Sequence, residues 1–384
     1  MDARIYLDHA ATTPLRPEAR AAMEPYLHHA FGNPSSLHAD GQQAKQALDA
    51  ARDIVASALG AEFAEISFTS GGTEADNAAL VGVMLANKER GDHLITTQIE
   101  HEAVGNTARF LETLGFRVTY LPVDTEGRIA PKQLEDALTD RTVLVSVMHA
   151  NNEVGTIQPL RDISEIVHAR GAFLHSDAVQ TFGQCAVNVD NLGVDLLSVS
   201  AHKIYGPKGA GALYVRRGIP IEPWLHGGGQ ERQRRSGTEN VAAIAGFGEA
   251  VRLLLPERET LAARLTALRD LLIARLRERI PGVVLNGHPT LRLPNNVNLS
   301  FPDLDAEALL VSLDMAGISA SSGSACTAGS IEPSHVLQAM HLPDSHVRSA
   351  IRLTLGRSMT EDEVCRTVDI LVKIIARLAT ENPL

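Results

Sequence analysis

The chain has 384 residues, of which 44% are hydrophobic and 21% charged, so it can bury a large core and form two domains. Its 35 Lys and Arg against 46 Asp and Glu give a net charge of −11, spread along the chain, which argues against nucleic acid or an anionic membrane as the main partner. Neither a signal peptide nor a membrane-spanning apolar stretch is visible, so we expect a cytoplasmic protein.

The three cysteines, Cys185, Cys326 and Cys365, lie far apart and lack the spacing of metal ligands. This pattern fits a reducing compartment and excludes a disulfide framework or a zinc site built on these residues. Each thiol therefore needs its own explanation. Cys365 adjoins the apolar stripe of the last predicted helix, so we expect it to be structural.

Seven short apolar runs alternate with helical patterns between about residue 50 and residue 215. Strands interleaved with helices over such a length form a largely parallel sheet covered on both faces, so this region is predicted to be an α/β domain. In chain order, the runs are "EISFTS", "HLITTQIE", "RVTYLPVD", "TVLVSVMHAN", "AFLHSDAV", "DLLSVSAHK" and "GALYVR".

A second, smaller α+β unit is predicted after Pro256. Leucines recur there at helical spacing, followed by the strand-like runs "NNVNLSF" and "SAIRLTL" and by a final helix that begins with a capping box from Thr360 to Glu363. We place the boundary near residue 257. The predicted domains are 15–257 for the large domain, and 1–14 with 258–384 for the small one.

The residues just after each apolar run are candidates for chemistry, because ligands of open α/β sheets bind at the carboxyl ends of the strands. "EISFTSGGTEADN" reads as a strand, a glycine turn and a helix start, which leaves the backbone N–H groups of Gly72, Thr73 and Glu74 free to bind a phosphate. Thr73 and Asp76 also match a capping box, and the two interpretations are compatible.

Two further strand ends carry titratable groups. His101 follows "TTQIE", and "FLHSDAVQ" brings Asp177 with Gln180 three residues later. Alone, Asp177 is either a helix cap or the partner of a cationic ligand group, and the cap is favoured. His175 and Asp177 share a strand face and could resemble a metal pair, but no third ligand has supporting spacing, so a metal site is disfavoured.

The run "DLLSVSAHKIYGPKGAGALYV" delivers Ser200, His202 and Lys203 into a turn at a strand end. A lone lysine would more often extend to the surface, but one at the end of a buried strand needs a partner or a lowered pKa, as a lysine that forms a Schiff base does. With donors for a phosphate beside it and Asp177 as an acid for a pyridinium nitrogen, the combination indicates pyridoxal 5′-phosphate.

Residues 321–330, "SSGSACTAGS", place Cys326 among small residues with no large apolar neighbour within four positions. Such a segment buries too little surface to offset its ordering entropy, so 321–332 is predicted to be a mobile loop. From this stretch alone, a linker and a reactive thiol are equally good interpretations.

The motifs together resemble those of pyridoxal-phosphate-dependent cysteine desulfurases of the nitrogen-fixation and iron–sulfur-cluster assembly type, from residue 5 to about 360. The resemblance implies the aspartate-aminotransferase fold, with a seven-stranded mixed sheet, and a homodimer whose active sites lie at the interface. It rests on "YLDHAATTP", "GNPSSLH", "FTSGGTEADN", "EHEAV", "NNEVGTIQP", "HSDAVQ", "SAHKIYGPKG", "RRSGTEN", "SSGSACTAGS" and "IRLTLGR".

The resemblance also implies residue roles. Lys203 is expected to form the Schiff base with the cofactor and to move the Cα proton of the substrate. His101 is expected to stack on the pyridine ring of the cofactor and to assist proton transfer. Asp177 is expected to keep the ring nitrogen protonated, and Gln180 to contact the ring oxygen. Arg352 is expected to clamp the substrate carboxylate. The remaining implied residues are Gly72, Thr73, Ser200 and His202 for the phosphate, Thr238 from the partner subunit, and Asn151 for the substrate.

The implied reaction converts L-cysteine to L-alanine and leaves the sulfur as a persulfide on Cys326, which passes it to iron–sulfur cluster assembly or another acceptor. An aminotransferase or selenocysteine lyase of the same fold is the nearest alternative, and the long Ser/Gly run around Cys326 favours the desulfurase. A sulfur carrier or scaffold without catalysis is disfavoured by the intact Lys203 motif. The chain ends soon after its final helix, where one branch of the family carries a tail that docks the cluster scaffold, so the acceptor stays open.

Overall fold

The computed structural model describes residues 4–302, 304–322 and 333–381. Its main layer is a seven-stranded sheet of order β2-β8-β7-β6-β5-β3-β4, in which β8 runs antiparallel to β2 and β7 and the other pairs are parallel. Each of the seven predicted apolar runs supplies one strand, so the predicted α/β sheet is confirmed. The strands are β2 (Ile66–Thr69), β3 (His93–Thr97), β4 (Arg117–Leu121), β5 (Thr142–Ser146), β6 (Phe173–Asp177), β7 (Leu196–Ser200) and β8 (Gly211–Val215).

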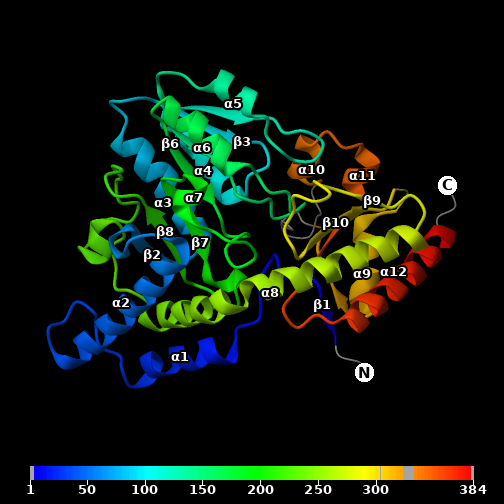
Figure 1. The fold of residues 1–384 in the computed structure, drawn as a ribbon, viewed down its shortest axis with the longest axis horizontal. Coiled ribbons are helices and arrows are strands. Elements are labelled where there is room, and N and C mark those ends of the chain that lie inside the picture. The colour runs from blue at the N-terminus through cyan, green and yellow to red at the C-terminus, as the bar shows by residue number, and fades with distance from the viewer. Residues whose placement is uncertain (1–3, 303, 323–332, 382–384) are drawn as a thin grey trace.

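Helices cover both faces of this sheet (Figure 1). Alternate residues of one strand belong to different core clusters: Ile95 packs into one and Leu94 into the other, which is why these strands read as continuous apolar runs. The helices of this part are α1 (Pro17–His28), α2 (Ala39–Leu59), α3 (Gly72–Ala86), α4 (Glu102–Thr113), α5 (Pro131–Ala137), α6 (Leu160–Ala169) and α7 (Val189–Leu192), with the short 3₁₀ turns η1 (Phe63–Glu65), η2 (Ala201–Lys203) and η3 (Gln230–Gln233).

A smaller layer is built on β10, which pairs antiparallel with β12 and β9, while β1 pairs in parallel with β11. The capping box is present: Thr360 N donates to Glu363 Oε2 over 2.9 Å, and Glu363 N donates to Thr360 Oγ1 over 3.2 Å. The elements are β1 (Ile5–Tyr6), β9 (Val284–Leu285), β10 (Asn296–Ser300), β11 (Ile318–Ser319), β12 (Ala350–Thr354), α9 (Ala306–Met315), α10 (His335–Ala339), α11 (Asp344–Arg348) and α12 (Glu361–Glu381).

One long helix, α8 (Val241–Arg279), runs through both parts and contains Pro256. Its first half packs into the core of the large sheet through Phe247, and its second half packs into a separate core through Leu265. Figure 1 shows α8 crossing from the one part to the other. These two cores support a division near residue 257, which we retain as a proposal.

Two local expectations are wrong. Cys365 is exposed on α12, because it lies beside the apolar stripe rather than in it. Thr73 does not cap a helix: α3 begins at Gly72, so Asp76 falls inside the helix and is buried. Within the described residues, no helix is long and apolar enough to cross a membrane.

Candidate active site

The carboxyl ends of β6 and β7 form the centre of the site. These strands are paired in parallel, with Asp177 opposite Ser198, and η2 follows β7 directly and carries Lys203. His101 comes from the loop after β3 and caps α4, its Nδ1 accepting from Ala103 N over 3.1 Å. Parallel strands end at one edge of a sheet, so residues far apart in the sequence meet here.

Lys203 is largely buried and points toward the N-terminal segment. Its Nζ donates to the backbone oxygen of Ala10 and, over 2.8 Å, to that of Ala11. Burial and the nearby charge of Arg352 lower the pKa of Lys203 to about 8, against the opposing charges of Asp177 and Asp8. About a tenth of the lysine is therefore a free amine at pH 7, and this is the form that reacts with carbonyl groups.

Asp177 is a buried carboxylate with local support. Its Oδ1 accepts from Val179 N over 2.8 Å within a turn. The next described helix, α7, begins only at Val189, so the favoured helix-cap interpretation of Asp177 is wrong. Burial raises the pKa of Asp177, while His101, Lys203 and the Val179 bond oppose this rise. Gln180, three residues on, turns its amide to the Ala10 carbonyl over 3.0 Å. A cationic ligand group beside Asp177 would stabilise its ionised form.

The glycine turn before α3 leaves room for an anion. A Cβ on Gly72 would lie 2.6 Å from Val179 Cγ2, so only glycine allows this close approach. Facing the turn, the hydroxyl of Ser200 is buried without a hydrogen-bond partner among the described residues. Burial, with Lys203 and Lys208, lowers the pKa of His202 to about 4, so its imidazole is neutral and bonds Thr12 Oγ1 through Nδ1 over 3.1 Å. Free N–H groups at the helix start complete a phosphate-sized donor set, to which the exposed Thr73 belongs.

Arg352 lies on β12 with its guanidinium almost fully buried. Nη2 donates to Asp8 Oδ1 over 2.8 Å and Nη1 to the Asn152 carbonyl over 3.1 Å. Its Nε has no partner among the residues described. The small sheet thus places a positive group with a spare donor near Lys203, whose pKa it lowers.

The structure does not bring Asn151 to the open site. This residue is fully buried, and its side chain bonds the backbone of Ile99, Glu153 and Val154. Its neighbour Asn152 is partly exposed and lies against Arg352 through its carbonyl. Asn151 stays a proposed substrate contact, and Asn152 is a second candidate for this contact.

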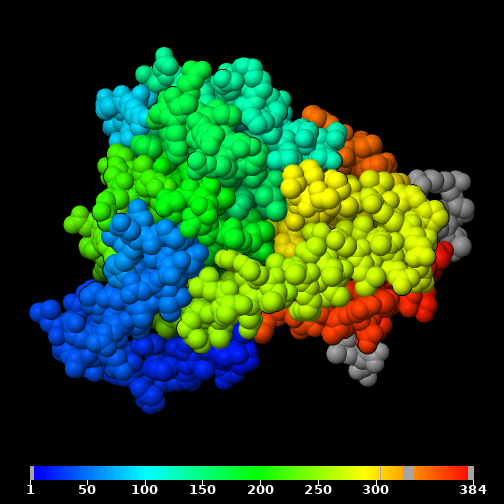
Figure 2. All heavy atoms as spheres, viewed as in Figure 1, coloured from blue at the N-terminus to red at the C-terminus, as the bar shows by residue number. Residues whose placement is uncertain are grey.

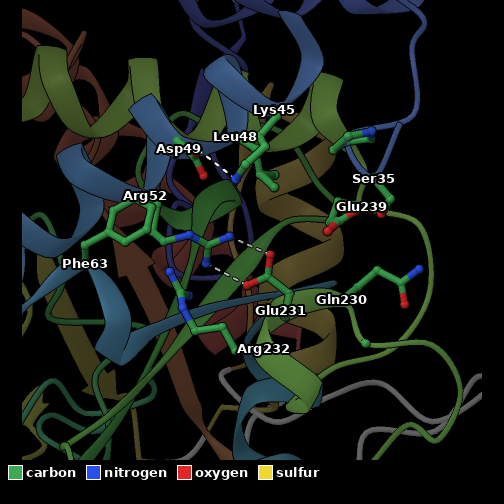
Figure 3. A pocket seen from close by; sticks show the side chains of 12 residues that line it. Ser35, Lys45, Leu48, Asp49, Arg52, Phe63, Gln230, Glu231, Arg232 and Glu239 are labelled. Atoms are coloured by element: carbon green, nitrogen blue, oxygen red, sulfur yellow. Dashed lines mark hydrogen bonds and ion pairs between the residues drawn. The ribbon is translucent and has the colours of Figure 1, made fainter. Parts of the chain in front are cut away.

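Thr238 is exposed and lines a pocket of about 160 Å³ that contains Ser70 and Arg235 but not Lys203, Asp177 or Ser200. Sequence reasoning missed the pocket beside it, of about 410 Å³, where Arg52 and Glu231 form a buried ion pair (Figure 3). The only sequence signal is the glycine-rich run before Thr238, because the two partners lie 179 positions apart.

Cys326 lies outside the described residues, but both flanks of its segment are fixed at this site. On one side, Ser321 N donates to the Arg352 carbonyl over 3.2 Å. On the other, Ser334 Oγ donates to Glu153 Oε2 over 2.5 Å, and His335 Nε2 bonds the Glu100 carbonyl over 3.0 Å. A metal centre has no support from geometry: in the part of the chain that is described, no group of three His, Cys, Asp or Glu could hold an ion.

The sequence profile of the family described as "Aminotransferase class-V" matches residues 5–366. The chain belongs to this family. It is 50% identical over 383 residues to a protein named cysteine desulfurase IscS from Dictyoglomus turgidum, covering 100% of this chain and 97% of the relative. A protein of the same name from Methanosarcina thermophila is 50% identical over 380 residues, or 99% and 94% of the two chains.

Solved structures agree with this membership. One described as a NifS-like protein superposes with a TM-score of 0.92 at 38% identity, covering 98% of this chain and 100% of its own. Another, described as SspA in complex with cysteine, has a TM-score of 0.82 at 37% identity and covers 91% and 98%. The expected aspartate-aminotransferase-like fold is confirmed.

Class-V aminotransferases depend on pyridoxal 5′-phosphate, which is the cofactor of this chain. The residues present fit it: the unpartnered Ser200 hydroxyl and the Gly72 turn suit its phosphate, and buried Asp177 suits its ring nitrogen. Lys203 supplies the amine for its aldehyde.

Proposed function

We propose that the chain is a cysteine desulfurase that converts L-cysteine to L-alanine and receives the sulfur on Cys326. The proposal rests on one observation: the reactive lysine and the flanks of the Cys326 segment lie at the same site. Lys203, with its pKa of about 8, faces Asp177 and Arg352, and both flanks of the Cys326 segment are fixed to residues of that same site. Two full-length relatives at 50% identity bear the name cysteine desulfurase, which supports this substrate.

The cofactor would be held by the site residues already described. The Gly72 turn, Thr73, Ser200 and His202 would bind its phosphate, Asp177 its ring nitrogen, Gln180 its ring oxygen, and His101 would cover its exposed face. When bound, pyridoxal 5′-phosphate withdraws electrons from the substrate Cα and so weakens the Cβ–S bond.

The protein groups supply binding and proton transfer. Arg352, with Asn152 beside it, would bind the substrate carboxylate through its guanidinium, whose Nε has no partner among the described residues. Lys203, as a free amine, takes the Cα proton and later returns a proton to carbon. The Cys326 thiolate attacks the substrate sulfur: an S–S bond forms, the Cβ–S bond breaks, and the carbon that loses sulfur gains a proton to become the alanine methyl group.

We also propose a homodimer, in which Thr238 reaches the partner's site. Figure 2 shows the residues of α1 and α2, in blue, protruding at one end of the molecule. This end exposes three large apolar side chains, Leu27, Phe31 and Leu37, with Leu37 92% exposed. Apolar side chains gathered in this way are typical of an interface. Further proposals are a cytoplasmic location and transfer of the persulfide sulfur to an acceptor such as an iron–sulfur scaffold protein.

The decisive experiment mixes the purified holoenzyme with L-cysteine and a reductant and assays sulfide and alanine together. Equal amounts of both products are expected from the wild type, and neither from Cys326→Ala. Cys365→Ala, which removes an exposed thiol on α12, is the matched control and should retain wild-type rates. Wild-type sulfide release by Cys326→Ala would show that another group accepts the sulfur.

A further inference from the structure

Three carboxyl groups lie buried together at the sheet edge below the site. Asp177 ends β6, Asp76 lies on α3 and Glu100 follows β3, and their exposed fractions are 7%, 1% and 3%. They interact electrostatically, because Asp177 raises the pKa of both Asp76 and Glu100. A low-dielectric interior does not hold three such charges at once.

The surroundings favour Asp177 as the charged member. It accepts a hydrogen bond from Val179 N, and His101 and Lys203 both lower its pKa against the effect of burial. For neither of the other two carboxyl groups does a neighbouring charge lower the pKa.

Asp76 is poorly supported as an anion, because burial, Asp177 and Glu100 raise its pKa and only the Ser198 hydroxyl lowers it. Neither of its oxygens has a hydrogen bond of normal geometry, and no Lys or Arg pairs with it, among the described residues. His175 Nε2 lies 3.6 Å from Oδ1, but both nitrogens of this fully buried imidazole bond to hydroxyls, Nδ1 to Ser146 over 2.8 Å and Nε2 to Ser198 over 3.1 Å. Burial lowers the pKa of His175 to about 3, so it offers no positive charge.

Glu100 is also poorly supported as an anion. Its Oε1 accepts from Thr97 Oγ1 over 2.8 Å and from Met148 N over 3.0 Å, while Oε2 has no partner in the described part of the chain. Burial raises the pKa of Glu100 to about 8, with Asp177 adding to the rise.

We propose that Asp76 is an un-ionised carboxylic acid at neutral pH and a positioning residue, which together with Glu100 confines the negative charge of this cluster to Asp177. The groups that face Asp76 are His175 and Asp177 from β6, Ser198 from β7 and Glu100 from the turn after β3. The inference rests on the proposed function only in taking Asp177 as the partner of the cofactor ring nitrogen.

The test measures the free energy of unfolding of the wild-type holoenzyme and of the Asp76→Asn holoenzyme in denaturant, from about pH 6 to about pH 8.5. An exposed aspartate, as in the unfolded chain, is ionised throughout this pH range. A protonated Asp76 must release its proton on unfolding, so the wild type loses stability as pH rises. The asparagine variant has no such proton. The ratio of wild-type to variant unfolding constants should therefore increase with pH, by about tenfold per pH unit as long as Asp76 stays protonated in the folded state.

Asp92→Asn is the control. Hydrogen bonds from Arg117 and Arg141 lower the pKa of Asp92 to about 2, so this group is ionised in both states and its variant should show a constant offset across the range. A constant offset for Asp76→Asn as well would mean that Asp76 is ionised, and the proposal would be overturned. Activity is not used, so a failed desulfurase assay leaves this test intact.

The positioning role is tested through cofactor affinity, measured by the absorbance of bound pyridoxal 5′-phosphate. Asp76→Asn should bind it within about twofold of wild type, because it keeps a neutral polar group, and apolar Asp76→Leu should bind it at least about tenfold more weakly. Equal affinities for the two variants contradict a positioning role. If Asp76→Leu does not fold, Asp76→Ala takes its place. The pH dependence of unfolding, measured on wild type and Asp76→Asn, still decides whether Asp76 is ionised.

Discussion

Arg352 Nη2 donates to Asp8 Oδ1 over 2.8 Å, so a carboxylate of the protein already occupies the guanidinium that we propose for the substrate. Backbone pairing fixes the two relative to each other, because Asp8 bridges to Thr354, two residues beyond Arg352 on β12. Asp8 also acts on Lys203, whose pKa it raises. The substrate carboxylate must therefore share Arg352 with Asp8 or displace it.

Replacing Asp8 with Asn should lower the KM for L-cysteine several-fold, because the amide no longer competes as an anion for Arg352. The same change should lower the free energy of unfolding by about 1–3 kcal/mol, since a buried guanidinium loses its counter-ion. Steady-state kinetics and denaturant unfolding measure the two effects. In the control Arg352→Gln, the KM should rise by at least about tenfold. A raised KM in Asp8→Asn would instead mean that Asp8 aligns Arg352 for the substrate.

Lys203 gives a prediction about pH. Because burial and Arg352 lower its pKa to about 8, the rate at which the apoenzyme recombines with pyridoxal 5′-phosphate should rise with pH to about 8 and level off above it. Removing the charge of Arg352 in Arg352→Gln should move this midpoint upward. Stopped-flow absorbance of the lysine-bound cofactor measures the rate, and Lys203→Ala should give no such signal. A midpoint near that of a free lysine in the wild type would contradict the burial argument.

The residues at the ends of the predicted strands located the candidate site from the sequence. The run "SVSAHK" places Ser200, His202 and Lys203 at the end of an apolar strand, and the edge at which parallel strands end brings them to Asp177. Neighbouring strand and loop motifs therefore predict one shared site from the sequence alone.

Side-chain direction was not predictable in the same way. Asn151 and Asn152 are adjacent and identical, yet only the first is fully buried, because its amide closes the turn onto the Glu153 and Val154 N–H groups. Asp76 fits a capping box by spacing, but the helix starts at Gly72 and turns it toward the sheet. Both outcomes depend on where a turn begins, which local sequence patterns fix poorly.

We expect Ser334 to contribute to sulfur transfer by positioning the chain next to the Cys326 segment. Its hydroxyl caps α10, accepting from Leu337 N over 3.1 Å, and also donates to buried Glu153, so it fixes the chain just after the Cys326 segment. Ser334→Ala should cost about 1–2 kcal/mol of stability and reduce the rate of sulfide release, while cofactor binding stays unchanged.

The control for Ser334 is Asp305→Ala, which removes the cap of α9, where Asp305 Oδ1 accepts from Ala308 N over 3.0 Å. This variant should lose similar stability but keep the wild-type rate of sulfide release. Equal rates of sulfide release in the two variants would show that the Ser334 hydrogen bond does not contribute to sulfur transfer.

The buried pair of Arg52 and Glu231 gives the largest expected change in stability. The guanidinium forms two bonds to the carboxylate, of 2.6 and 2.7 Å, and the carboxylate also accepts from Phe68 N over 2.8 Å (Figure 3). The pair joins α2 to the chain that leads to Thr238. It also holds a strained backbone, because Glu231 and the two residues after it all have positive φ, of 45°, 57° and 65°.

Glu231→Gln should therefore lower the free energy of unfolding by about 3–5 kcal/mol, because it leaves the charge of Arg52 buried and uncompensated. The double variant Arg52→Met, Glu231→Leu removes both charges. It should be destabilised by less than the sum of its two single changes, and a double-mutant cycle in denaturant unfolding measures this coupling. The exposed pair of Arg217 and Glu62 is the control, because water already solvates its charges, and Glu62→Gln should leave the unfolding midpoint unchanged. Additive effects at Arg52 and Glu231 would show that the strained backbone, and not the ion pair, holds this loop in place.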